Sequence, residues 1–173
     1  VTLAAGLVPS APAPARAEPN RFALGDSVML GARSELRDRG FRVDADESRQ
    51  SYKGPALLRK RGAHLARNVV VHLGTNGSFP LDTCKRMVRI AGPDRQVFLV
   101  TVHAQRSWIR GNNRVIRQCA AAFPKRVHVV DWDWAANRHP GWFYSDRIHL
   151  KPAGAKAFAN LIDFAVDRYG TLN

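Results

Sequence analysis

Two long apolar runs, NVVVHL at residues 68–73 and QVFLVTV at residues 96–102, constrain the fold more than any other feature of the chain. Neither shows the polar–apolar alternation of a strand with one wet face, so both are typical of strands covered on two sides. We expect further strands at residues 22–25, 41–45 and 126–130, and helices at residues 28–39, 51–66, 80–91, 112–123 and 152–169. This alternation predicts a three-layer α/β/α sandwich with a five-stranded parallel sheet.

The first 20 residues differ in composition from the rest of the chain. A short apolar run, Val1 to Val8, leads into a Pro- and Ala-rich stretch that ends in Ala-Arg-Ala at Ala17. This pattern resembles the end of a secretory signal peptide, and the alternative is an Ala/Pro linker. Both interpretations predict a single domain over residues 21–173 that is secreted or extracytoplasmic. No later run is long enough to span a membrane.

The chain is strongly basic, with 27 Lys and Arg against 14 Asp and Glu and a formal net charge of +13. That excess implies attraction to something anionic, such as nucleic acid, a membrane surface or an acidic wall polymer. The arginines are spread along the chain, and no zinc-finger, helix-turn-helix or RNA-binding signature accompanies them. We therefore expect no nucleic-acid partner, and we expect a monomer with a basic surface that suits an anionic cell-wall polymer.

Three short motifs fall where the predicted strands end: Gly25-Asp26-Ser27, Gly74-Thr75-Asn76, and the pair Asp146 and His149. Ligands of open α/β sheets bind outside the carboxyl ends of the strands. A serine at the start of a helix faces unpaired N–H groups, which favour a nucleophile or an oxyanion, although it can also be a simple cap. Each motif is weak alone, and their common position is the informative feature.

The residue types in these motifs suit nucleophilic catalysis. Ser27 would be the nucleophile, His149 its general base and then general acid, and Asp146 the carboxylate that orients His149. The amide of Asn76 could donate to a developing oxyanion. This chemistry needs no metal and no cofactor.

In their order and spacing these motifs resemble the conserved blocks of SGNH/GDSL hydrolases, over residues 21–169. Further stretches, at residues 48–50, 130–132, 139–144 and 149–154, are similar to the extracellular acyltransferase-type domain of OatA-like peptidoglycan O-acetyltransferases. The resemblance implies a flavodoxin-like fold and an oxyanion hole made by Ser27, Asn76 and a third donor. Many SGNH hydrolases use a glycine for that donor; none stands here, so the backbone N–H of Ser48 or Arg49 would replace it.

Several other residues are candidates with a structural alternative. Arg49, Gly74, Trp108 and Trp142 are candidate substrate-binding residues, although Trp142 could instead pack the loop that presents Asp146. His72, His103 and His128 lie on or beside predicted strands, and we interpret them as buried or hydrogen-bonded residues and not as metal ligands. Cys84 and Cys119 are expected to form a disulfide if the chain is secreted, the alternative being two buried thiols.

The sequence therefore predicts serine-dependent acyl transfer through an acyl-serine intermediate, as an esterase, an acetyl-esterase or an O-acetyltransferase acting on cell-envelope carbohydrate. The alternative is a non-enzymatic basic module that binds an anionic wall polymer. The basic surface motivates this alternative, but it gives no reason for the joint presence of Ser27, Asn76, Asp146 and His149.

Overall fold

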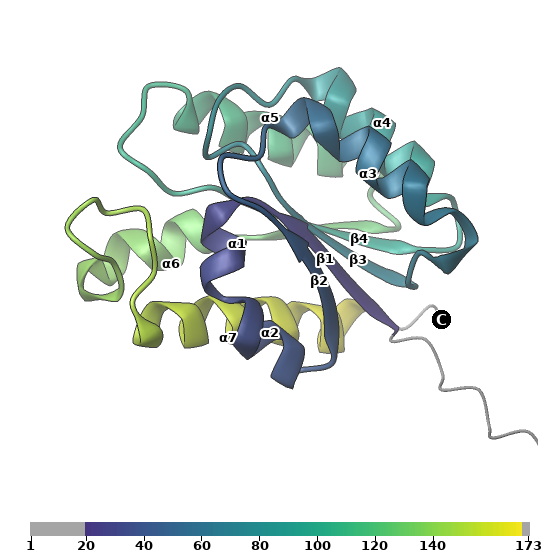
Figure 1. The fold of residues 1–173 in the computed structure, drawn as a ribbon. Coiled ribbons are helices and arrows are strands. Elements are labelled where there is room, and N and C mark those ends of the chain that lie inside the picture. The colour runs from purple at the N-terminus through teal and green to yellow at the C-terminus, as the bar shows by residue number, and fades with distance from the viewer. Residues whose placement is uncertain (1–19, 171–173) are drawn as a thin grey trace, which may run out of the picture.

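The computed structural model describes residues 20–170, so the predicted signal peptide or linker lies outside the described residues. Five strands form one parallel sheet between two layers of helices (Figure 1). The strands are β1 (Arg21–Gly25), β2 (Phe41–Ala45), β3 (Asn68–His72), β4 (Gln96–Val100) and β5 (Val127–Val130). The predicted three-layer sandwich and its five-stranded parallel sheet are confirmed.

The strands pair in the order β2-β1-β3-β4-β5. The chain leaves β1 towards β2 and then returns past β1 to β3, so connections on the two sides of β1 run in opposite directions. Gly25 at the end of β1 lies between Ala45 of β2 and His72 of β3. This reversal creates a crevice at the carboxyl ends of β1 and β3, the usual place for a ligand in such folds.

The helices divide between the two faces of the sheet (Figure 1). One face carries η1 (Ser51–Lys53), α3 (Gly54–Arg61), η2 (Gly62–His64), α4 (Leu81–Ala91) and α5 (Ile109–Ala121). The other carries α1 (Ser27–Gly31), α2 (Arg33–Asp38) and α7 (Pro152–Tyr169), with α6 (Trp132–Arg138) and η3 (Pro140–Trp142) following β5.

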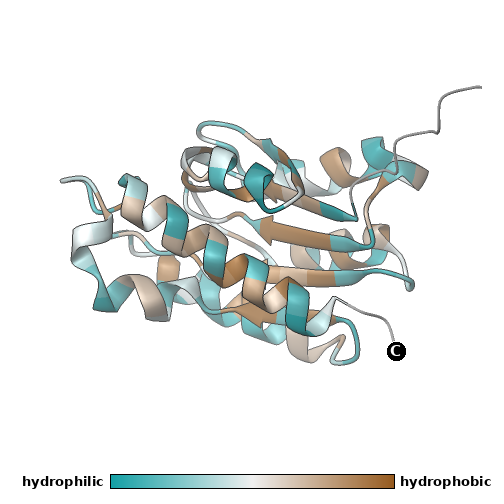
Figure 2. Cartoon of the chain, turned by 90° about the horizontal axis from the view of Figure 1, so that it is seen from below, coloured by the Kyte–Doolittle hydropathy of each residue, from teal (hydrophilic) through white to brown (hydrophobic). Residues whose placement is uncertain are grey.

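Successive residues of β1, β3 and β4 contribute to two separate cores, one on each face of the sheet. Val69 and Val71 of β3 pack with α3, α4 and α5, whereas Val70 packs with α1, α2 and α7. Both sides of a strand are therefore apolar, and Figure 2 shows strands that are mostly brown between helices that alternate brown and teal. This double burial explains the two continuous apolar runs in the sequence.

The helices differ from the prediction in several places, and α5 begins and ends slightly earlier than expected, at Ile109 and Ala121. The helix predicted over 28–39 is divided at Ala32, directly after Gly31, a residue type with low helix propensity. The helix predicted over 51–66 is shorter, because 3₁₀ turns replace its ends at Gly54 and Gly62. Helix α6 was not predicted; it begins where the Asp131 carboxylate caps the backbone N–H of Trp134 at 3.4 Å.

A disulfide joins α4 to α5 within the core on the face of the sheet that these two helices cover. Cys84 and Cys119 form it across 35 residues of sequence, with their Cα atoms 6.3 Å apart. Both half-cystines are fully buried. The bond ties together the helices that precede and follow β4 in the chain and therefore limits how far these helices can separate.

Candidate active site

A cleft of about 740 Å³ opens at the carboxyl ends of β1 and β3. Ser27, Asn76 and His149 all line it, although they come from three separate regions of the sequence. The rest of its wall is formed by Leu30, Gly31, Glu47, Ser48, Thr75, Arg106, Trp108 and Ile148. The cleft is large enough for a small ligand such as a sugar ring with an acyl group.

The turn that carries Ser27 is fixed by the buried carboxylate of Asp26. Its Oδ1 accepts from the backbone N–H of Val28 at 3.2 Å, which caps α1. The same oxygen lies 3.2 Å from Nδ1 of His72, and both side chains are fully buried. The Asp26 backbone N–H donates to the carbonyl of His72 at 3.2 Å. Ser27 is thus held as the first residue of a helix, where N–H groups have no partner within the helix.

The imidazole of His149 bridges Ser27 and Asp146. Its Nδ1 lies 2.7 Å from Asp146 Oδ2, and its Nε2 lies 3.2 Å from Ser27 Oγ. A carboxylate can only accept, so Nδ1 carries the proton and Nε2 is free to accept the hydroxyl proton of Ser27. This is the arrangement that a serine nucleophile needs.

The chain around Asp146 and His149 forms a compact turn. Asp146 Oδ1 accepts from the backbone N–H groups of Ile148 at 2.8 Å and His149 at 3.0 Å. Arg147 has a φ of 56°, in the left-handed region, which lets the turn close over so few residues. The orientation of the carboxylate is therefore set within the turn itself.

These contacts lower the pKa of Asp146 from 3.8 to about 2. The largest cause is the hydrogen bond with the side chain of His149, and the backbone N–H of Ile148 adds to it. A lowered pKa means that the carboxylate takes up a proton only in stronger acid. Asp146 therefore stays ionised across the whole range in which histidines ordinarily titrate.

Replacing His149 by Ala should raise the pKa of Asp146 towards its ordinary value, because the largest cause of the lowering is removed. The return should be incomplete, since the backbone N–H groups of Ile148 and His149 still donate to the carboxylate. Carboxyl ¹³C chemical shifts followed between pH 1.5 and 6 would measure both values. His64→Ala, which removes an exposed histidine far from Asp146 in the chain, is the matched control. An unchanged pKa in His149→Ala would contradict the contact.

The segment that presents this turn is anchored on α7. Phe143 and Leu150 form an isolated antiparallel bridge, and the backbone N–H of Lys151 donates to the carbonyl of Trp142 at 2.8 Å. Gly154 of α7 lies against the same residue: a Cβ at Gly154 would fall 2.3 Å from the Trp142 carbonyl oxygen. Glycine is required there because any side chain would push the segment away from the helix.

Three groups around Ser27 can donate to an oxyanion. The Ser27 N–H begins α1, and the Asn76 side chain lines the cleft, where its Nδ2 lies 3.5 Å from the Arg49 carbonyl in a long contact. Ser48 also lines the cleft and has a φ of 51°, a conformation that favours glycine. Ser48 thus adopts a glycine-like conformation at the block where many SGNH hydrolases have a glycine.

The four candidate substrate-binding residues divide into one in the cleft and three outside it. Trp108 lines the cleft and donates from Nε1 to the carbonyl of Thr75 at 3.2 Å. Gly74 is buried behind the cleft with a φ of 114°. Trp142 stacks on Trp132, with ring centroids 5.6 Å apart, and on His139. Trp142 therefore lies where the alternative interpretation has it, packed within the loop region that presents Asp146.

Arg49 points into the protein and not into the cleft. Its guanidinium donates to the carbonyls of Gly25 at 3.1 Å and Asp44 at 2.7 Å and to the Asp44 carboxylate at 2.8 Å. Burial alone would raise the pKa of Asp44, but hydrogen bonds from Arg61 and Arg49 outweigh burial and lower it. Arg49 therefore ties β1 to β2 below the nucleophile, and no donor of its side chain is turned to a substrate.

Two polar residues that the sequence did not single out support the site. Asn112 of α5 is buried; it donates to the carbonyls of Gly74 and Gly77 at 2.8 Å each and accepts from Phe79 N–H at 2.8 Å. It thereby fixes the loop that carries Asn76. Asn113 makes a similar pair of bonds with Val102. Their one sequence signal is a polar Asn-Asn pair inside an otherwise amphipathic helix.

The remaining histidines lie apart from any cluster of metal ligands. His72 pairs with Asp26, His103 Nδ1 lies 2.9 Å from Asp133 Oδ1, and His128 Nε2 lies 2.8 Å from Gln96 Oε1. Among residues 20–170, no group of three or more His, Cys, Asp or Glu side chains could hold a metal ion. Over the same residues, none of the helices is both long and apolar enough to cross a lipid bilayer.

Comparison with known proteins shows that the chain is similar in sequence to O-acetyltransferases and in fold to esterases. The chain is 31% identical over 153 residues to O-acetyltransferase OatA of Staphylococcus aureus, a match that covers 86% of this chain and 25% of the relative. It thus spans about a quarter of the length of this relative. The structure superimposes on the C-terminal catalytic domain of Streptococcus pneumoniae peptidoglycan O-acetyltransferase A with a TM-score of 0.77 at 22% identity, covering 86% of this chain and 93% of that one. A family 3 carbohydrate esterase from Talaromyces cellulolyticus has a TM-score of 0.69 at 15% identity, with 86% and 96% covered. No protein-family model matches the chain.

Proposed function

This chain resembles OatA-type O-acetyltransferases in sequence and SGNH/GDSL hydrolases in fold, and from that premise we propose that it transfers an acyl group through Ser27. The observation that carries the proposal is the continuous contact from Ser27 Oγ through the His149 imidazole to the Asp146 carboxylate. The cleft beside Ser27 supplies the space for an acyl ester.

The first half-reaction acylates the enzyme. Ser27 Oγ attacks the carbonyl carbon of an acyl ester while its proton passes to His149 Nε2, and Asp146 stabilises the resulting imidazolium. The negative charge on the carbonyl oxygen is met by Ser27 N–H, Asn76 Nδ2 and Ser48 N–H, each such donor contributing about 3 kcal/mol to the transition state. Collapse breaks the ester bond, and His149 gives its proton to the leaving alkoxide.

The second half-reaction releases the acyl group. A hydroxyl, from water or from a sugar, loses its proton to His149 as its oxygen attacks the acyl carbon. Collapse of this second intermediate returns the proton to Ser27 Oγ and frees either the carboxylic acid or the new ester. The same residues serve both outcomes, so what enters the cleft decides between hydrolysis and transfer.

We propose an acetyl group as the acyl group and cell-envelope carbohydrate as the acceptor, because the sequence resembles an O-acetyltransferase and the structure resembles the catalytic domain of a peptidoglycan O-acetyltransferase. An acceptor of this kind places the domain outside the cytoplasm. The disulfide between Cys84 and Cys119 supports such a location, because disulfides persist in oxidising compartments. Every catalytic group comes from one chain, so a monomer is sufficient.

The test is a donor–acceptor assay on purified protein. A small activated acetate ester is supplied with and without glycan oligosaccharides, and acetylated sugar and free acetate are measured separately. We expect acetate release in both cases and acetylated sugar when a glycan is present. If free acetate is the sole product, the protein is an esterase and the proposed transferase activity is rejected. A Ser27→Ala variant that still consumes the ester would reject the proposal as a whole.

The alternative, a non-enzymatic module for an anionic wall polymer, is favoured by the net charge of +13. It requires binding that weakens with salt and that survives loss of Ser27. Binding of this kind is compatible with catalysis, because a basic surface can hold an enzyme close to an anionic substrate. A chain that binds the polymer yet shows no Ser27-dependent turnover would favour the alternative.

A further inference from the structure

A second hollow of about 970 Å³ lies beside the catalytic cleft and is not used by the chemistry above. Five arginines line it, and we call it the arginine groove: Arg106, Arg110, Arg114, Arg117 and Arg147. Helix α5 forms one wall, and α6 with the segment that follows it forms the other. Arg106 lines both the groove and the cleft, so the two hollows adjoin at this residue.

The arginines of α5 are arranged as a stripe. Arg110, Arg114 and Arg117 are spaced by four and three residues, which places them on one face of the helix. At a rise of about 1.5 Å per residue they cover about 10 Å along the axis, comparable to the length of two sugar units. All three are exposed to solvent.

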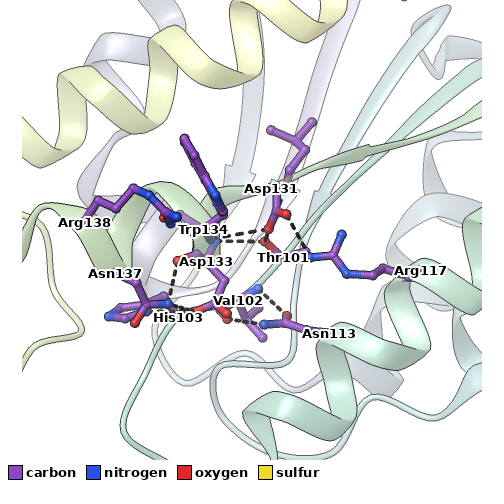
Figure 3. Close-up of polar contacts among 11 residues, drawn as sticks. Thr101, Val102, His103, Asn113, Arg117, Asp131, Asp133, Trp134, Asn137 and Arg138 are labelled. Carbon is purple, nitrogen blue, oxygen red and sulfur yellow. Dashed lines mark hydrogen bonds and ion pairs between the residues drawn. The ribbon is translucent and has the colours of Figure 1, made fainter.

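Most of this positive charge is not neutralised by the protein. Within residues 20–170, Arg106, Arg110, Arg114 and Arg147 have no carboxylate partner, whereas Arg117 pairs with Asp131 at 2.8 Å. The one carboxylate that lines the groove, Asp133, is already bonded to His103 and Asn137 (Figure 3). The four unpaired guanidinium groups outnumber this carboxylate, so the groove is positively charged, above a floor that contains Ile109, Ala136 and Phe143.

We propose that the arginine groove binds a carboxylate-bearing stretch of the acceptor glycan and so directs an adjacent sugar hydroxyl to acyl-Ser27. Guanidinium groups bind carboxylates through paired hydrogen bonds, and four of the five arginines have no carboxylate partner among residues 20–170. The inference rests on the proposed function and adds to it the charge of the acceptor and the path by which it reaches the cleft.

A charged glycan suits the groove better than the other anionic partners do. The arginines line a concave hollow between two walls, whereas a bilayer surface requires a flat or convex basic face. The aromatic side chain in the groove, Phe143, is 3% exposed, so it offers no platform on which a nucleic-acid base could stack.

The test compares two charge-reversed proteins that carry the same net charge. Arg110→Glu/Arg114→Glu alters the groove, and Arg86→Glu/Arg89→Glu alters exposed arginines of the neighbouring helix α4. Each pair is made in the Ser27→Ala background. Binding is measured for a hexasaccharide of N-acetylglucosamine and N-acetylmuramic acid with free carboxylates, and for the same sugar after reduction of its carboxylates to alcohols.

We expect the groove pair to weaken binding of the carboxylate sugar about tenfold and to leave the reduced sugar within about twofold, whereas the α4 pair changes neither by more than about twofold. Equal losses from both pairs, or an equal loss for both sugars, would overturn the inference. A glycerol-phosphate oligomer is the third probe: if it binds more tightly than the carboxylate sugar and loses affinity in the groove pair, the assignment to carboxylates is overturned.

Turnover separates failure of this inference from failure of the proposed function. With Ser27 intact, the groove pair should hydrolyse the small acetate ester at the wild-type rate, because neither Arg110 nor Arg114 lines the catalytic cleft, while transfer to the carboxylate sugar falls about tenfold. Loss of ester turnover in the wild type itself would reject the proposed function, whereas wild-type transfer rates in the groove pair would reject the groove.

Discussion

Replacing Ser27 by Ala should lower kcat/KM for a small acetate ester at least about 10⁴-fold, while the protein keeps its fold. Among residues 20–170, Ser27 Oγ is the one nucleophile in contact with His149 Nε2, at 3.2 Å, and alanine provides no hydroxyl to acylate. The turn itself should persist because Asp26, and not Ser27, caps α1. Ester hydrolysis followed by absorbance, with circular dichroism for the fold, measures both parts.

The matched control is Ser34→Ala, which removes an exposed serine hydroxyl from α2. It should leave turnover within about twofold, as surface changes away from a site usually do. A serine-directed phosphonate should label the wild type and Ser34→Ala but not Ser27→Ala. Labelling of Ser27→Ala would show that another residue is the nucleophile.

Replacing His149 by Ala should cost about as much activity as the loss of Ser27, and the double variant should be no worse than either single one. Both residues act in one proton transfer, so removing either abolishes the same step. The measurement is the rate of ester hydrolysis by the two single variants and the double variant, on the same ester and at high enzyme concentration. Losses that multiply in the double variant would show that the two side chains act independently.

The activity of Asp146→Asn is the comparison for that of His149→Ala. An amide can present its N–H to Nδ1 and so favour the wrong tautomer of His149, which lowers activity by roughly 10²–10⁴-fold. The Asp146 side chain is 45% exposed, so water screens its charge and we expect the lower end of that range. The order of losses should therefore be His149→Ala first and Asp146→Asn second.

The sheet was predictable because its strands are buried on both faces, which leaves continuous apolar runs at residues 68–73 and 96–102. Helix α6 was missed because its seven residues are too few to show a helical period, and its two tryptophans suggested a loop. Trp132 is in fact buried against α7, a contact between distant parts of the chain that no local pattern reveals.

The positions of Ser27 and Asn76 followed from motifs at strand ends, since the carboxyl ends of parallel strands meet at one edge of the sheet. Asp146 and His149 do not follow a strand directly, because α6 and η3 lie between β5 and their turn. The direction in which a side chain points was less predictable. Arg49 lies beside the candidate donor Ser48, yet its guanidinium turns back to Asp44. The arginine groove was not predicted either: the stripe on α5 is local, but its opposite wall comes from residues 133–147.

The single turn that contains both Asp146 and His149 has a consequence for how such a site can diversify. Three hydrogen bonds fix the base to its carboxylate within four residues of chain, whereas one contact joins the base to Ser27. Sequence changes in the flanking loop can therefore move Asp146 and His149 together as one unit, without changing how the two side chains are aligned with each other. Adaptation to a bulkier acyl group needs only one distance to be retuned.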